Sequence, residues 1–277
     1  MRYSSIHTHT LFCDGKDDVE TLCRRAWEKG LVSLGFSSHA PVRQKTGFVT
    51  DWHIPDEKLG QYLDEVRAAK SRWEGRLRVL LGLEVDYIEG LMGPSAKDIH
   101  ALGLDYVIGS VHYVVPPRGS PFTVDESLPE FEAGLREGFS GDAGAMIATY
   151  WDAVEGMIHA GGFDVLGHVD LVKKNLAKSP LTKGLSANDL DGRRFSRIAA
   201  LLEGSPVVVE INTGGLNRGY VEETYPGLEL LRLLRERNVL VTITADAHCA
   251  DQLDGHYELA RETLLRAGYT EADCVQW

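Results

Sequence analysis

Residues 77–85 read LRVLLGLEV, an apolar run of strand length that carries one acidic side chain, Glu84, near its end. The preceding segment, Glu57–Glu74, has the spacing of an amphipathic helix, and another strand-like run follows at Tyr106–Val111. An unpaired carboxylate buried inside a strand is energetically expensive, so Glu84 is expected to have a bound partner. This stretch predicts a repeating helix–strand unit with a candidate functional carboxylate near the end of the strand.

The same alternation of strand-like and helix-like segments runs along the whole chain. The predicted strands are Tyr3–His7, Val32–Ser37, Leu77–Val85, Tyr106–Val111, Phe163–Gly167, Val207–Ile211 and Val239–Thr244. The predicted helices lie near Val19–Lys29, Glu57–Glu74, Ala96–Leu102, Ala143–His159, Ala187–Glu203, Gly227–Arg237 and Leu253–Ala267. Units of this kind predict a mostly parallel sheet with helices outside it, which closes naturally into an α/β barrel. An open doubly wound sheet is the alternative architecture.

The length of 277 residues suits one barrel-type domain, and we expect residues 1–277 to form it. The segment Val115–Ser140 contains four prolines and is predicted to be a long loop over the face that carries the strand ends.

Composition limits the classes of partner. The net charge of −12, from 41 acidic and 29 basic residues, disfavours nucleic acid but leaves a small phosphate ester open, since bound cations would make a pocket locally positive. The apolar runs are shorter than the roughly 18 residues of a membrane span, and the first ten residues lack signal-peptide features. The four cysteines form no C-x-x-C pair and are typical of reduced thiols, so a cytoplasmic location is expected.

Nearly every predicted strand ends at a side chain that can bind a metal ion. In a parallel barrel these ends share one face, and residues at positions i and i+2 of a strand point the same way. The candidate ligands are His7, His9, His39, Glu84, His112, His168, Asp246 and His248. Imidazole and carboxylate donors suit Zn, Mn or Fe, and eight donors are too many for one ion. Two or three divalent ions are therefore expected.

The remaining histidines, His53, His100, His159 and His256, fall in predicted loops or helices and are expected to be structural. Asp14 is a ninth candidate ligand. Because it precedes Gly15, the alternative is that Asp14 is simply a turn residue.

In this order, the candidate ligands resemble the pattern of the polymerase-and-histidinol-phosphatase (PHP) superfamily: H-x-H, an isolated His, a Glu, two further His, and D-x-H. The resemblance extends from residue 7 to residue 248. Within the superfamily, the chain is most similar to the monofunctional histidinol-phosphatases of histidine biosynthesis. The stretches that carry this similarity are HTHTLFCDG (7–15), SSHAPV (37–42), LLGLEVDYIEG (80–90), GSVHY (109–113), LGHVDLVKK (166–174) and EINTGGLNRGYVEETYPG (210–227).

The resemblance implies a distorted seven-stranded barrel, similar to a TIM barrel, with three metal ions. It also implies hydrolysis of L-histidinol phosphate to L-histidinol and phosphate by metal-activated hydroxide. The implied ligand sets are His7, His9, Glu84 and Asp246 for the first ion, Glu84, His112 and His168 for the second, and Asp14, His39 and His248 for the third. Glu84, Asp246 and His248 are expected to act in catalysis.

Basic side chains are expected to bind the phosphate group, and the candidates are Arg218, Lys173, Lys174, Arg118 and Arg43. The sequence departs from the family here, since Arg218 lies one position later than the family's arginine. Lys173 and Lys174 stand where the family is rich in arginine, and lysine lacks the forked geometry that grips a phosphate at two points.

Other functions remain open from the sequence. Another phosphoesterase of the same superfamily could act on a nucleotide bisphosphate or a sugar phosphate. A non-catalytic metal-binding regulatory domain is the alternative from another class, although such domains typically lose ligands that this chain keeps. An amidohydrolase on a related barrel would carry a bridging lysine where this chain has Glu84. The general acid for the leaving group and the oligomeric state are left open.

Overall fold

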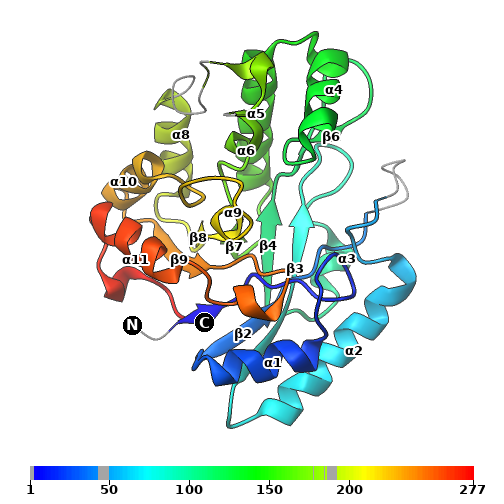
Figure 1. The fold of residues 1–277 in the computed structure, drawn as a ribbon, viewed down its shortest axis with the longest axis vertical. Coiled ribbons are helices and arrows are strands. Elements are labelled where there is room, and N and C mark those ends of the chain that lie inside the picture. Colours follow the sequence, from blue (N-terminus) through cyan, green and yellow to red (C-terminus); the bar gives the residue numbers. More distant parts are fainter. Residues whose placement is uncertain (1–2, 43–49, 177, 184, 186–191) are drawn as a thin grey trace.

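The computed structural model describes residues 3–42, 50–176, 178–183, 185 and 192–277, which form a parallel sheet surrounded by helices (Figure 1). Seven strands lie side by side in the order of the chain. They are β1 (Ser4–Ser5), β2 (Ser33–Phe36), β3 (Arg78–Asp86), β4 (Tyr106–Ser110), β7 (Val165–Leu166), β8 (Val208–Asn212) and β9 (Leu240–Thr244). All six pairings between neighbours are parallel, as expected for strands linked by crossover helices.

The ends of the sheet meet at the ligand motifs. A parallel bridge pairs Thr8 with Ala247, and the His9 N–H donates to the Ala247 carbonyl at 2.8 Å. The sheet is thus nearly closed into a barrel, which confirms the predicted fold class. The strand order has no point where it reverses, so the open doubly wound sheet is wrong.

Each predicted helix is present, with ends that differ by a few residues. The helices are α1 (Val19–Glu28), α2 (Asp56–Trp73), α3 (Lys97–His100), α5 (Ala143–Ala160), α8 (Gly192–Leu202), α10 (Leu228–Glu236) and α11 (Tyr257–Arg266). The prediction for the first residues of Ala187–Glu203 lies outside the described residues. Short helices α6 (Lys173–Leu176) and α9 (Gly214–Asn217) follow β7 and β8, and 3-10 turns occupy Pro180–Thr182, Ala250–Gln252 and Glu271–Asp273. Of the helices described, none has the length and apolarity needed to cross a bilayer.

Helix α1 illustrates how local sequence sets these elements. Asp18 caps its N-terminus by accepting a hydrogen bond from the Thr21 N–H at 2.7 Å. One face of the helix is buried against the sheet through residues at helical spacing, namely Val19, Leu22, Cys23 and Ala26. Figure 1 shows α1 and α2 beside β2 and β3, with α10 and α11 on the side of β9.

The prediction of one long loop over Val115–Ser140 is wrong. Strand β6 (Phe122–Thr123) pairs with β5 (Tyr113–Val114), and helix α4 occupies Leu128–Phe139. The helix packs closely against β6 at a glycine, since a Cβ atom at Gly134 would lie 2.4 Å from the Phe122 ring. The segment nevertheless reaches the strand-end face, where Asp125 lines the main cavity.

The inside of the barrel is packed below the site. A small buried cluster is formed by residues of β3, β4 and β7 and by the residue that follows β1, namely Leu80, Tyr106, Ile108, Val165 and Ile6. Leu80, Gly82 and Glu84 alternate along β3 and so face the same side, which places Glu84 above this cluster. Tyr106 fills the space beside Gly82, where a Cβ atom would lie 2.6 Å from the ring.

Candidate metal centre

A cavity of about 590 Å³ opens where the parallel strands end. It is lined by seven of the nine predicted ligands: Asp14, His39, Glu84, His112, His168, Asp246 and His248. His7 and His9 are fully buried and contact these residues from within the barrel. The structure therefore brings all nine predicted ligands to one place.

Glu84 lies at the centre of the histidines. Its carboxylate is 1% exposed, and five imidazole rings approach it. The distances to Oε2 are 3.2 Å from His7 Nε2, 3.0 Å from His39 Nδ1 and 3.6 Å from His9 Nε2; those to Oε1 are 2.9 Å from His168 Nε2 and 3.7 Å from His112 Nε2. Burial raises the pKa of Glu84, but the surrounding histidines, led by His7 and His39, hold it well below its usual value. An ionised carboxylate with both oxygens approached in this way can bridge two ions.

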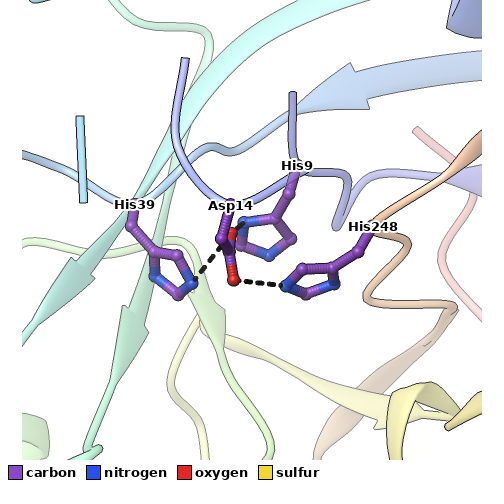
Figure 2. A group of neighbouring side chains, drawn as sticks. All are labelled: His9, Asp14, His39 and His248. Carbon is purple, nitrogen blue, oxygen red and sulfur yellow. Dashed lines mark hydrogen bonds and ion pairs between the residues drawn. The ribbon is translucent and has the colours of Figure 1, made fainter. Parts of the chain in front are cut away.

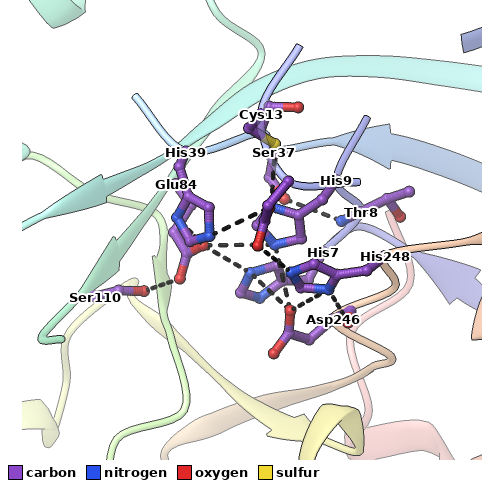
Figure 3. Close-up of polar contacts among 12 residues, drawn as sticks. His7, Thr8, His9, Cys13, Ser37, His39, Glu84, Ser110, Asp246 and His248 are labelled. Atoms are coloured by element: carbon purple, nitrogen blue, oxygen red, sulfur yellow. Dashed lines mark hydrogen bonds and ion pairs between the residues drawn. The ribbon is translucent and has the colours of Figure 1, made fainter. Parts of the chain in front are cut away.

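Asp246 forms the opposite side of the cluster. Its Oδ1 lies 3.3 Å from His9 Nε2, 3.8 Å from His7 Nε2 and 3.6 Å from His248 Nδ1. Figure 3 shows the contacts that His7 and His9 make with both Glu84 and Asp246. Asp246 has a φ of 48°, a left-handed conformation that is uncommon outside glycine and is concentrated at functional sites.

Asp14 also lies within the cluster. Figure 2 shows it among the rings of His9, His39 and His248. Its Oδ2 lies 3.0 Å from His248 Nε2, and its Oδ1 lies 3.6 Å from His9 Nδ1 and 3.9 Å from His39 Nε2. These four residues can surround one ion, with His9 joining the three expected ligands.

The chemistry of these donors fits divalent metal ions. Several buried atoms have no hydrogen-bond partner within the described chain, and they converge here: Nε2 of His7, Nε2 of His9, Nδ1 of His39 and Oε2 of Glu84. Buried polar atoms without a hydrogen bond are costly, and a metal ion would be bound by these atoms together. Burial, followed by the rings of His248 and His39, lowers the pKa of His9 to about 3, so this imidazole is neutral, as a ligand must be.

Two buried carboxylates beside the cluster were missed by sequence reasoning. Asp86 accepts from His112 Nδ1 at 2.6 Å and from His53 Nε2 at 2.7 Å. Glu210 accepts from His7 Nδ1 at 2.8 Å. The signal that identified Glu84 could have found both, because each is an acidic residue inside or at the end of an apolar strand.

Only some of the predicted phosphate-binding residues lie at the cavity. Arg218 and Lys174 line the cavity. Lys173 points elsewhere and binds Asp170 Oδ2 at 2.8 Å, Glu223 Oε1 at 2.9 Å and the Thr224 carbonyl at 2.8 Å. Arg118 is exposed and is not among the described residues that line the cavity. Arg43 lies outside the described residues.

Comparison with known proteins agrees with this geometry. A protein of Deinococcus radiodurans named a probable histidinol-phosphatase is 32% identical over 87% of this chain and 85% of its own length. The histidinol-phosphatase of Bacillus subtilis is 25% identical over 91% of this chain and 96% of its own. These alignments span nearly the full length of both relatives.

Solved structures share the fold. A candidate histidinol phosphatase of Listeria monocytogenes has a TM-score of 0.81 and 22% identity, covering 92% of this chain and 99% of its own. The histidinol phosphate phosphatase of Lactococcus lactis, solved with Zn, L-histidinol and phosphate, has a TM-score of 0.68 and 18% identity, covering 97% and 95%. The family model of the PHP domain matches residues 5–214, about three quarters of the chain, so this chain belongs to the PHP domain family.

Proposed function

We propose that this chain is a metal-dependent phosphatase that hydrolyses L-histidinol phosphate to L-histidinol and phosphate. The observation that carries the proposal is the cluster of nine candidate metal ligands, Glu84 and the eight side chains gathered near it, at a cavity whose wall also holds Arg218 and Lys174. The relatives named histidinol-phosphatases, aligned over most of their length, support the same substrate. The free cysteines suit a reducing compartment, so we place the reaction in the cytoplasm.

The proposed ligand sets follow the family resemblance and the contacts. The first ion would be held by His7, His9, Glu84 and Asp246, the second by Glu84, His112 and His168, and the third by Asp14, His39 and His248, with His9 near enough to join it. Divalent ions bound in this way polarise water and neutralise charge on a phosphoryl group, which suits one of the slowest uncatalysed reactions in biology.

The chain's own residues bind and orient the ester. Arg218 and Lys174 supply positive charge on the cavity wall, where phosphoryl oxygens not bound by metal would be held. Glu84, Asp246 and His248 would contribute to catalysis by holding the ions in place. The two carboxylates also supply negative charge, which keeps the bound cations at this end of the barrel.

The rest of the cavity wall favours histidinol phosphate over other small esters. Its acidic residues are Asp51, Asp125 and Glu126, and its aromatic residues are Trp52, Tyr220 and Tyr225. Carboxylates attract the ammonium group of histidinol and repel the second phosphate of a nucleotide bisphosphate. Aromatic rings provide flat surfaces for the imidazole of the substrate. A sugar phosphate would offer neither a cation nor a ring of this type.

Phosphate release by the zinc- or manganese-loaded protein tests the proposal. L-Histidinol phosphate would be compared with p-nitrophenyl phosphate, a sugar phosphate and a nucleotide bisphosphate at matched concentrations. We expect kcat/KM for histidinol phosphate to exceed the others by at least about 100-fold, because binding of the histidinol half positions the reacting group. Equal, weak rates across the panel would retain a metallophosphoesterase and reject the substrate.

A further inference from the structure

Glu210, in the middle of β8, is fully buried beneath the metal cluster and belongs to none of the ligand sets. Its carboxylate accepts four hydrogen bonds, two at each oxygen. Oε2 accepts from His7 Nδ1 at 2.8 Å and Thr244 Oγ1 at 2.8 Å, and Oε1 accepts from the His168 N–H at 2.6 Å and Asn212 Nδ2 at 2.8 Å.

These bonds occupy the acceptor capacity of both oxygens, so Glu210 is not itself a metal ligand. They also connect three strand ends. His7 follows β1, the His168 amide follows β7, and Thr244 ends β9. Through these bonds, the Glu210 carboxylate contacts His7 of the first proposed metal site and His168 of the second.

The two ring nitrogens of His7 face different partners. Nδ1 lies against Glu210, whereas Nε2 points to Glu84 Oε2 at 3.2 Å and Asp246 Oδ1 at 3.8 Å. A carboxylate accepts a hydrogen bond only from a nitrogen that carries a proton. The neutral ring is therefore protonated at Nδ1 and has its lone pair at Nε2, the atom that faces the proposed ion.

We propose that Glu210 is a positioning residue that fixes the tautomer and orientation of His7, so that His7 binds metal through Nε2. This inference rests on the proposed role of His7 as a ligand. A hydrogen bond from the second nitrogen of a metal-bound histidine to a carboxylate is a general way to orient the ring and increase its basicity.

Substitution by glutamine separates this role from simple packing. In Glu210→Gln the side chain keeps its shape, and its amide oxygen can retain the bonds from the His168 N–H and Asn212, which are obligatory donors. The amide NH₂ then faces His7 and Thr244. The threonine hydroxyl can rotate to accept, but His7 can accept at Nδ1 only by moving its proton to Nε2, where it blocks metal binding.

Zinc affinity is the first readout, measured by competition with a chelator of known affinity. We expect Glu210→Gln to weaken the zinc site that includes His7 by about 10- to 100-fold, with circular dichroism unchanged. Glu155→Gln is the matched control, because Glu155 on α5 is another buried carboxylate, is bound by Arg194 and Arg197 of α8, and is not among the described residues that line the cavity. Wild-type zinc affinity in a folded Glu210→Gln protein would overturn the inference.

The tautomer itself is the second readout, and it is measured in the wild-type protein, so it does not require Glu210→Gln to fold. Burial lowers the pKa of His7, but Glu210 and Glu84 outweigh it and hold this pKa well above its usual value in the metal-free protein. The ring must therefore be examined in the zinc-loaded wild type. We expect ¹⁵N NMR to show a proton on His7 Nδ1 and zinc at Nε2, with the resonances assigned through His7→Asn. Zinc at Nδ1, or a proton at Nε2, would overturn the proposal.

These measurements do not depend on the substrate. If the wild-type protein showed no preference for histidinol phosphate but Glu210→Gln lost zinc, the proposed substrate would fail while the role of Glu210 stood. If the wild type hydrolysed histidinol phosphate and Glu210→Gln bound zinc normally, the proposed substrate would stand and the proposed role of Glu210 would fail.

Discussion

Arg218 Nη2 lies 2.9 Å from Oδ2 of Asp246, and the Nη1 atom of the same guanidinium lies 3.1 Å from the Asp246 carbonyl. Nη1 also approaches His248 Nδ1 at 2.8 Å. The arginine predicted to bind phosphate therefore also fixes two proposed metal ligands. Because it lines the cavity at the same time, it couples the position of the ligands to the site that receives the ester.

Substitution of Arg218 should lower kcat/KM by more than the loss of a phosphate contact alone, because Arg218 also holds Asp246. Arg218→Ala removes a positive charge from the cavity and leaves Asp246 without its guanidinium partner, so kcat/KM should fall by roughly 100-fold. Arg218→Lys keeps the charge but loses the fork, and a loss of roughly tenfold is expected. Steady-state kinetics with histidinol phosphate and zinc analysis of each variant would check this. Unchanged kcat/KM in Arg218→Ala would contradict it.

The neighbouring lysines should behave differently from each other. Lys174→Ala removes a charge that lines the cavity, so KM for histidinol phosphate should rise about tenfold. Lys173→Ala should leave KM nearly unchanged and lower the free energy of unfolding by roughly 1–3 kcal/mol, because it leaves the buried Asp170 carboxylate without its ammonium partner. Kinetics and denaturant titration of both variants decide the matter. A larger KM effect from Lys173→Ala would reverse this assignment.

Most of the fold could be predicted from the sequence because strands and helices alternate with different periods. The nine-residue strand β3 differs from its prediction by one residue at each end. By contrast, β1 has only two residues where five were predicted, since pairing beyond Ser5 depends on contacts with β2 and β9 that are distant in the sequence. Helix α4 was missed because the prolines of the segment predicted a loop, whereas the helix packs through Gly134 and Gly138 against Phe122 and Pro116, contacts that no local pattern reveals.

The candidate metal ligands could be predicted from the sequence more readily than the residues that hold them in place. His7 and His9 lie two residues apart at a strand end, and Glu84 is a carboxylate inside an apolar run, so local sequence was enough to identify them. Glu210 interrupts a similar run, but only the fold shows that its oxygens face His7 rather than the cavity. The two adjacent lysines also looked equivalent in sequence. They differ because Lys173 meets Asp170 and Glu223, whereas Lys174 pairs with Asp125 at the cavity wall.

Loss of one proposed ligand should abolish most activity while the fold persists. His9→Ala or Asp246→Asn should reduce kcat by about 100-fold or more, since either change removes a donor from the metal cluster. His100→Ala is a suitable control, because His100 is exposed in the short helix α3 and belongs to no described metal group. Near-normal turnover in His9→Ala or Asp246→Asn would contradict the proposed ligand assignment.

Removal of metal should lower stability as well as activity. Ions that bind only the folded protein stabilise it by about 2.7 kcal/mol at 100 times their dissociation constant. Dialysis against a chelator should therefore lower Tm by roughly 5–10 °C in a chain of this size, and zinc or manganese should restore it. Calorimetry with metal analysis would check this. Full turnover by protein shown to be free of metal would be incompatible with the proposed mechanism.

Two glycines test whether the loop that carries Asp14 must be tight. At Gly15 a Cβ atom would lie 2.5 Å from backbone atoms of His9 and Thr10, which cannot move without displacing a ligand. Gly15→Ala should cost roughly 1–3 kcal/mol of stability and reduce activity by shifting Asp14. Gly60, exposed within α2, has no atom within 4 Å of its Cβ position, so Gly60→Ala should raise stability by roughly 0.5–1 kcal/mol and leave kcat unchanged. Denaturant titrations and kinetics of the pair would show whether the effect at Gly15 is specific, because equal responses would mean that the close approach to His9 has no consequence.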